Sequence, residues 1–183
     1  MVRVIAGSAR GVPLKAPKGE GTRPTADRVK ESVFSVIGGR VVDAVVLDLF
    51  AGTGALGIEA LSRGARRALF VEKDPRVAKV LKHNLEKCRL VDAAHVLVAS
   101  VPPRLPLPGD FDRFDLVLLD PPYDRGLVRP ALEWLAANRL VAPGGWVVVE
   151  RSAREEMPSN LENLALIREK PYHETIVSFL ESG

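Results

Sequence analysis

The sequence is poor in the residues that build covalent or metal-linked scaffolds. Its 183 residues include one cysteine, three histidines, two methionines and no glutamine. A single cysteine, Cys88, excludes a disulfide framework and any zinc site made from several cysteines, and is typical of the reducing cytosol. The histidines at 83, 95 and 173 share no metal-ligand spacing. We therefore expect no metal site.

Long apolar runs are also lacking. None approaches the roughly 20 residues that a membrane helix needs, and residues 1–10 lack the apolar core of a signal peptide. We expect a cytoplasmic protein with no membrane contact. Hydrophobic residues make up 46% of the chain and charged residues 27%. This balance excludes disordered, collagen-like and low-complexity proteins, and the length fits one domain with a sizeable core.

The net charge of +3 is unevenly distributed along the chain. Residues 1–40 hold eight basic and three acidic side chains, a net charge of +5, so the remaining residues carry a net charge of −2. A basic end on a nearly neutral body is typical of proteins that contact phosphate backbones, and it also fits a solvated, arginine-rich surface. We divide the chain into a basic extension, residues 1–40, and a main domain, residues 41–183.

Apolar periodicity predicts an N-terminal hairpin and helix, followed by strands that alternate with helices. Segments 2–5 and 12–15 alternate in polarity and indicate the hairpin; the helix is capped by Thr25 and ended by Gly38-Gly39. We then predict strands at 44–49, 68–72, 95–99, 115–119 and 146–150, helices at 55–63, 75–88 and 127–138, and a closing antiparallel pair near 164–169 and 174–180. Nearly continuous apolar strands joined by helices predict a mostly parallel sheet covered on both faces.

The strongest motif lies between the first of these strands and the helix after it. Gly52, Gly54 and Gly57 form a G-x-G-x-x-G pattern. In this pattern the first glycine permits a tight turn, the second lets a ligand approach the backbone and the third lets helix and strand pack closely. Glu72 ends the next strand, where a carboxylate can accept hydrogen bonds from ribose hydroxyls. The pattern predicts a site for a nucleoside-type cofactor.

Asp48 narrows the choice of cofactor, because it lies at the end of the strand just before the glycine pattern. A dinucleotide would place its pyrophosphate at the helix N-terminus, where a neighbouring carboxylate is unfavourable. The same carboxylate suits the ammonium and sulfonium groups of S-adenosylmethionine. Asp48 alternatively caps the loop by accepting backbone N–H hydrogen bonds, and one carboxylate can fill both roles.

A second motif, Asp120-Pro121-Pro122-Tyr123, follows the apolar strand 115–119. Ligands of open α/β sheets bind at the carboxyl ends of strands, and two consecutive prolines restrict the loop. The Asp120 carboxylate and the Pro121 carbonyl are then both available to a planar amine. A simple Asp-Pro turn is the alternative; the strand, the position and the aromatic side chain together favour a site.

These motifs resemble the amino-methyltransferases, which methylate exocyclic nitrogens of bases with S-adenosylmethionine. More narrowly, the chain resembles the bacterial 16S ribosomal RNA guanine-N2 methyltransferase family (the RsmD type). The likeness covers most of the chain and includes Arg3–Gly11, Arg23–Glu31, Asp48–Ala65 and Asp120–Tyr123. Asp-Pro-Pro-Tyr alone is shared with DNA adenine methylases, whereas its combination with Arg-Pro-Thr and the glycine-loop helix is specific.

The resemblance implies a Rossmann-like class I methyltransferase fold with a seven-stranded sheet. It also implies methyl transfer to the N2 amine of one guanine in 16S ribosomal RNA, free or in a partly assembled small subunit. The Asp120 carboxylate and the Pro121 carbonyl would accept hydrogen bonds from the amine, so that its lone pair points at the methyl group. Tyr123 would stack on the guanine. We expect a monomer.

The candidate residues fall into three sets. The candidates for binding the base are Asp120, Pro121, Pro122 and Tyr123. The candidates for binding the cofactor are Asp48, Phe50, Ala51, Gly52, Thr53, Gly54, Glu72, Lys73 and Ser100. The candidates for binding RNA phosphates are Arg3, Arg10, Lys15, Lys18, Arg23 and Arg28. Ser100 stands where similar enzymes often have an acid or amide that binds the adenine amino group, and its hydroxyl replaces that carboxylate only partly.

Three other functions fit part of the pattern. The glycine pattern by itself also permits an NAD-dependent oxidoreductase. A chain that keeps the fold without turnover would be a ribosome-assembly factor. Asp-Pro-Pro-Tyr fits a DNA adenine methylase, although the chain has no room for a separate target-recognition domain.

Overall fold

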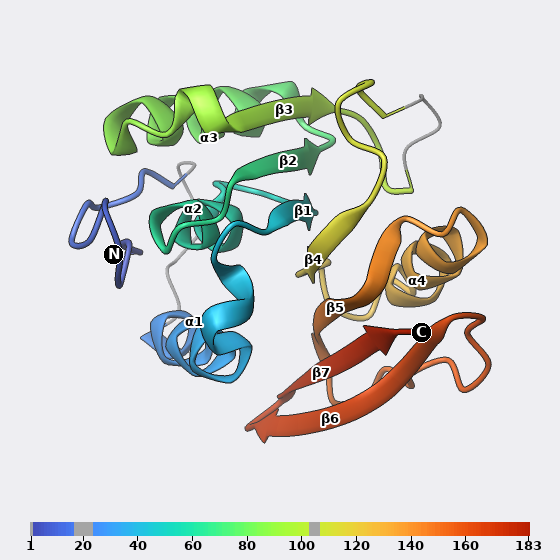
Figure 1. The fold of residues 1–183 in the computed structure, drawn as a ribbon. Helices are drawn as coiled ribbons and strands as arrows, with labels where there is room; N and C mark the ends of the chain where they lie inside the picture. The colour runs from blue at the N-terminus through green and yellow to red at the C-terminus, as the bar shows by residue number, and fades with distance from the viewer. Residues whose placement is uncertain (1, 17–23, 103–106) are drawn as a thin grey trace.

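The computed structural model describes residues 2–16, 24–102 and 107–183, and its elements follow the predicted order (Figure 1). The helices are α1 (Pro24–Ile37), α2 (Ala55–Ser62), α3 (Pro75–Cys88) and α4 (Val128–Ala137), with short 3-10 turns at Gly38–Val41 and Val91–Ala93. The strands are β1 (Val45–Leu49), β2 (Arg67–Glu72), β3 (Ala94–Val98), β4 (Phe114–Leu119), β5 (Val141–Ser152), β6 (Leu164–Tyr172) and β7 (Thr175–Ser182). None of the described helices is long and apolar enough to cross a membrane.

The strands form one sheet in the order β3-β2-β1-β4-β5-β7-β6. Strands β1 to β5 pair in parallel, and β7 runs antiparallel between β5 and β6. Helices α1, α2 and α3 cover one face of the sheet and α4 covers the other (Figure 1). The predicted mostly parallel sheet with a closing antiparallel pair is confirmed.

Side chains alternate between the two faces along each central strand, which gives the protein two apolar layers. Val46 and Phe70 pack with the helices α1, α2 and α3. Leu47 and Leu49 pack with α4 on the other face. Burial on both faces explains why these strands are almost continuously apolar in the sequence.

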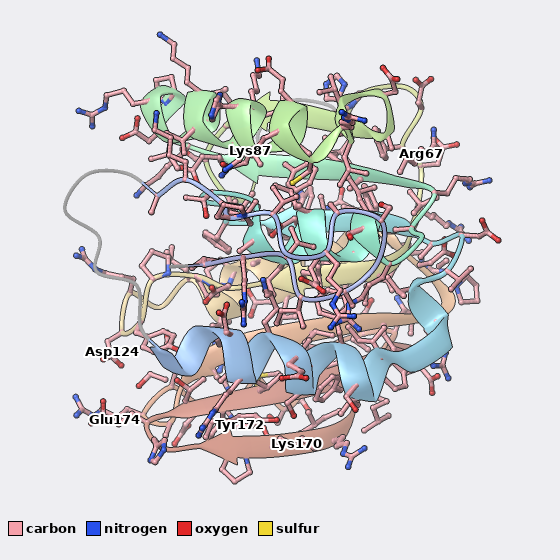
Figure 2. All side chains as sticks on the ribbon, turned by 90° about the vertical axis from the view of Figure 1, so that its left-hand side faces the viewer. Arg67, Lys87, Asp124, Lys170, Tyr172 and Glu174 are labelled. Atoms are coloured by element: carbon pink, nitrogen blue, oxygen red, sulfur yellow. The ribbon has the colours of Figure 1, made fainter. Side chains whose placement is uncertain are left out.

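Residues 2–16, which we call the N-terminal arm, contain the predicted hairpin in a minimal form. One isolated antiparallel bridge joins Arg3 to Pro13, supported by the hydrogen bond from the Val4 N–H to the Val12 carbonyl at 3.0 Å. Figure 2 shows the arm crossing α2, between α3 and α1. Gly7 lies so close to this helix that a Cβ there would come within 1.7 Å of the Ser62 carbonyl oxygen.

Several element boundaries differ by a residue or more from the sequence prediction, and two of the differences have a clear physical reason. Helix α1 begins at Pro24, one residue before the predicted cap Thr25, because the fixed φ of proline suits a first helical position. Strand β5 begins at Val141 instead of near residue 146. The predicted Gly144-Gly145 turn lies inside β5, where residues 142–145 bulge opposite Asp115 of β4.

Candidate active site

The two predicted motifs lie next to each other because their strands are neighbours in the sheet. Strands β1 and β4 pair in parallel with Leu49 opposite Leu119. The glycine loop, residues 50–54, and the loop that begins at Asp120 therefore start at equivalent positions on one edge. On the other side of β1, Val71 lies opposite Leu49 and brings Glu72 to the same edge.

The edge in question is the carboxyl end of the parallel strands. Figure 2 places Asp124, which directly follows Tyr123, at one end of the molecule and Arg67, the first residue of β2, at the opposite end. Glu174, in the turn between β6 and β7, lies at the same end as Asp124 (Figure 2). The two motifs thus share the end at which ligands of open α/β sheets bind.

The glycine loop is built from residues with left-handed backbone geometry. Phe50, Gly52 and Gly54 have φ angles of 62°, 55° and 84°. A Cβ on Gly54 would lie 2.2 Å from the Leu81 side chain, whereas at Gly52 only the Phe50 carbonyl oxygen, at 3.9 Å, comes within 4 Å among the described atoms. The missing side chain at Gly54 therefore permits close packing against α3, whereas the space beside Gly52 is open. The role of each glycine toward a ligand stays a prediction.

The third glycine has the packing role that the pattern predicts. A Cβ on Gly57 would lie 2.3 Å from the Phe70 ring and 2.8 Å from the Asp48 carboxylate. Helix α2 can approach β1 and β2 this closely only because residue 57 has no side chain.

Glu72 fixes the position of the glycine loop. One oxygen of its carboxylate accepts a hydrogen bond from the Gly52 N–H at 2.9 Å and the other accepts one from the Asp74 N–H at 2.8 Å. The side chain is buried. Because each carboxylate oxygen has two acceptor positions, Glu72 can hold the loop and still accept hydroxyl hydrogen bonds.

Asp48 lies buried beneath the same loop, with 1% of its surface exposed. Its Oδ2 accepts the Gly57 N–H at 2.9 Å, so the loop-capping role considered from the sequence is present. Burial raises the pKa of Asp48 to about 7; the Gly57 N–H opposes this shift and the Glu72 carboxylate adds to it. No ion pair within the described residues involves Asp48 or Glu72. Two carboxylates without a basic partner favour a positively charged ligand.

Asn84 of α3 connects the N-terminal arm to the glycine loop and was not predicted. Its amide NH₂ donates to the Lys15 carbonyl and to the Thr53 carbonyl, each at 3.0 Å, and its Oδ1 accepts the Lys15 N–H at 2.8 Å. The side chain is fully buried. A polar residue on the apolar stripe of a helix, between Leu81 and Leu85, was the signal available in the sequence.

Tyr123 is held in place by two side chains from distant parts of the chain. Its hydroxyl donates to the Glu150 carboxylate at 2.7 Å and also hydrogen-bonds the Thr175 hydroxyl at 2.7 Å. Burial raises the pKa of Tyr123 above its ordinary value, so the phenol stays protonated. Glu150 follows Val149, which lies opposite Leu119, and Thr175 begins β7. Neither residue was predicted.

The other candidate cofactor and base residues lie at or near this edge with varied exposure. Ser100 reaches it because the Ala99 N–H donates to the Glu72 carbonyl at 3.1 Å. Asp120, Pro122, Lys73 and Ser100 are exposed, Phe50, Thr53 and Tyr123 are half-buried, and Ala51 and Pro121 are buried. Which of them contact ligands stays a prediction.

The candidate RNA residues are distributed over the arm and α1. Arg3, Arg10, Lys15 and Arg28 are exposed, while Lys18 and Arg23 lie outside the described residues. Lys30 is a basic residue of the extension that points inward: it pairs with the buried Glu59 at 3.4 Å, and burial lowers the pKa of this lysine. Glu59 also accepts the Ile5 and Ala6 N–H groups. Part of the basic charge therefore fixes the arm to α2.

The strand order, with β7 inserted antiparallel between β5 and β6, defines a Rossmann-like class I S-adenosylmethionine-dependent methyltransferase fold. An RNA methyltransferase from Salinibacter ruber, solved in complex with S-adenosyl-L-homocysteine, shares this fold with a TM-score of 0.62 at 18% identity over 89% of this chain and 94% of that one. A protein from Escherichia coli described as "Putative methyltransferase yhhF" has a TM-score of 0.84 at 33% identity, covering 99% of this chain and 97% of that one.

The chain belongs to the family described as "Conserved hypothetical protein 95", whose family model matches residues 2–181. A relative from Haemophilus influenzae, named "Ribosomal RNA small subunit methyltransferase D", is 40% identical over 171 residues, 92% of this chain and 88% of that protein. The resemblance stated from the sequence motifs is thereby confirmed.

Proposed function

We propose that the protein transfers a methyl group from S-adenosylmethionine to the exocyclic N2 amine of a specific guanine in 16S ribosomal RNA. The observation that carries the proposal is the pairing of Leu49 with Leu119, which sets the glycine loop and the Asp120 loop side by side. The name of the Haemophilus influenzae relative supports a small-subunit ribosomal RNA as the substrate.

The residues around the glycine loop suit the chemistry of this cofactor. When bound, S-adenosylmethionine supplies a methyl group on a sulfonium centre. Glu72 provides negative charge beside the loop, Asp48 adds negative charge beneath it when ionised, and Gly52 leaves room above it. Glu72 has acceptor positions left for ribose hydroxyls. A pyrophosphate at the N-terminus of α2 would lie near the Asp48 carboxylate, which disfavours an NAD-dependent oxidoreductase.

The Asp120 loop orients the amine that receives the methyl group. An aromatic amine is a weak nucleophile because its lone pair is delocalised into the ring. When the exposed Asp120 carboxylate and the Pro121 carbonyl accept its two N–H hydrogen bonds, the nitrogen can pyramidalise and direct the lone pair at the methyl carbon. The methylated nitrogen is cationic and releases its proton readily, so no strong base is required.

Tyr123 forms the platform on which the guanine stacks. Stacking of a base on an aromatic side chain contributes about 1–3 kcal/mol. The hydrogen bond that the Tyr123 hydroxyl donates to Glu150, together with its hydrogen bond with Thr175, fixes the phenol and through it the ring. The guanine must leave any helix to reach this platform, either by flipping or from a loop.

Asp120→Asn tests the assignment of the base-binding loop, with Asp124→Asn as a matched control on the same loop. We expect the first variant to lose transfer of tritiated methyl groups to 16S ribosomal RNA by about 100-fold or more. Its affinity for S-adenosylmethionine, measured by calorimetry, should stay within about threefold of wild type, because Asp120 lies outside the glycine loop.

Four outcomes would contradict the proposal. Equal loss of transfer and cofactor affinity would show that Asp120 is structural. Binding of NADH in place of S-adenosylmethionine would indicate an oxidoreductase. Lack of transfer both to naked RNA and to partly assembled subunits would indicate an assembly factor, and preferential transfer to DNA adenine would indicate a DNA methylase. Primer extension on RNA from a strain lacking the protein would identify the nucleotide.

A further inference from the structure

Helix α3 concentrates positive charge that the rest of the main domain lacks. Its 14 residues contain four basic side chains and one acidic one, Glu86, although residues 41–183 together carry a net charge of −2. The four basic side chains are all exposed: Arg76, Lys79, Lys82 and Lys87. Among the ion pairs of the described residues, none involves Lys79 or Lys82.

This arrangement is not explained by the stability of the helix. Lys79 and Lys82 are three residues apart, and like charges at this spacing repel each other by a few tenths of a kcal/mol. Helix α4 shows the usual alternative, because its exposed Arg129 pairs with Glu133 at 3.6 Å. The uncompensated charge on α3 is therefore available to an anionic partner.

The N-terminal arm lies directly against this helix. The Lys87 ammonium donates to the Pro13 carbonyl at 2.7 Å, and Asn84 holds both backbone groups of Lys15. Figure 2 shows Lys87 beside the arm where the arm passes α3. The backbone of Lys15, whose side chain is exposed, is thus attached to the helix that carries the exposed lysines.

The same helix begins at the carboxyl edge of the sheet. Asp74 caps its N-terminus by accepting the Arg76 N–H, and the Asp74 N–H in turn donates to Glu72, which holds the glycine loop. The basic face therefore extends from the cofactor edge, along α3, to the arm. Arg76 at this end pairs with Asp74 at 2.8 Å, so a polyanion that enters from this side meets Lys79 and Lys82, which no ion pair among the described residues includes.

We propose that the exposed face of α3, with Lys79 and Lys82 at its centre, binds backbone phosphates of the substrate RNA together with the arm. This inference rests on the proposed function, since it names a second contact surface for the same RNA. Each phosphate contact releases counterions, and the dependence of log K on log salt is about 0.7 per contact for single strands and 0.9 for duplexes. At 0.1 M salt, compared with 1 M, each contact therefore strengthens RNA binding roughly five- to eightfold.

The test compares three double variants in filter binding and methyl transfer with 16S ribosomal RNA. The α3 variant combines Lys79→Ala with Lys82→Ala, and the arm variant combines Arg10→Ala with Lys15→Ala. The control variant combines Arg129→Ala with Arg168→Ala. The control removes the same charge from α4 and β6. We expect the α3 variant to bind RNA about 25-fold more weakly at 0.1 M salt, with a salt slope lower by about 1.4. Its cofactor affinity should match wild type, and the control should bind RNA like wild type.

An α3 variant with wild-type RNA affinity and salt slope would overturn the inference, and so would an equal loss in the control variant. A loss confined to the arm variant would show that the surface ends at the arm. Failure of the proposed function is a separate result, because it appears as the lack of methyl transfer by the wild-type protein itself.

Discussion

Replacement of Asp48 by asparagine isolates the effect of one buried carboxyl group on stability. The Asp48 side chain is 1% exposed, and its Oδ2 accepts the Gly57 N–H at 2.9 Å. An asparagine oxygen can accept the same N–H. The substitution therefore preserves the hydrogen bond and the volume and removes the ionisation; the NH₂ group that it introduces does not titrate, so it adds no pH dependence.

The pKa of Asp48 determines the sign and size of the effect. Burial raises it from 3.8 to about 7 in the folded protein, so folding favours the protonated form. The resulting stabilisation is fully present below pH 3.8 and is lost as the pH rises through 7. At 1.36 kcal/mol per pKa unit, the free energy of unfolding of the wild type should fall by about 4 kcal/mol relative to Asp48→Asn between pH 4 and pH 8.

Urea unfolding at pH 4, 6 and 8 measures this difference. Other titrating groups are the same in both proteins, so the difference between their free energies of unfolding reports Asp48 alone. Asp112→Asn changes an exposed aspartate and should follow the wild type at every pH. Parallel curves for the wild type and Asp48→Asn would refute the argument, because they would show that the carboxyl ionises as easily in the folded protein as in the unfolded chain.

Two further predictions concern the residues that hold the site in place. Asn84→Ala removes three hydrogen bonds of a fully buried side chain, so we expect a loss of about 2–4 kcal/mol in urea unfolding and weaker cofactor binding by calorimetry. Asn84→Asp places a carboxylate against the Lys15 and Thr53 carbonyl oxygens and should be at least as destabilising; unchanged cofactor binding in both variants would show that Asn84 does not position the glycine loop. Thr175→Val removes one hydrogen bond to Tyr123 and Tyr123→Phe removes both, so single-turnover methyl transfer should slow by about 2- to 12-fold per hydrogen bond at unchanged cofactor affinity. Wild-type rates in both variants would show that the ring needs no support from β5 and β7.

The features that were predicted correctly depend on local sequence. The alternation of strands and helices follows from apolar periodicity within each segment. The placement of Asp48, Glu72 and Asp120 at one edge follows from the rule that parallel strands end together. The glycine pattern likewise indicated a sharp turn, although the packing of Gly54 against Leu81 was not predicted.

The features that were missed depend on contacts between distant segments. Glu150 and Thr175 meet Tyr123 only because β7 pairs antiparallel with β5, and periodicity does not specify this register. Asn84 reaches Thr53 and Lys15 because the arm folds back over α2 and α3. Lys15 and Asn84 are 69 residues apart in the chain. The bulge in β5 also depends on the neighbouring strand β4, because it is a shift in the pairing register of the two strands opposite Asp115.

Helix α2 is anchored at both of its ends. Near its beginning the Gly57 N–H is bound to Asp48, and near its end Glu59 and Ser62 receive the N–H groups of the arm. An isolated helix of eight residues is unstable in water, so α2 owes its order to its apolar packing, which includes the fully buried Ile58 and Ala60, and to these attachments. The arm is therefore a structural support of the helix that follows the glycine loop as well as an extension of the chain, and we expect its removal to loosen that loop.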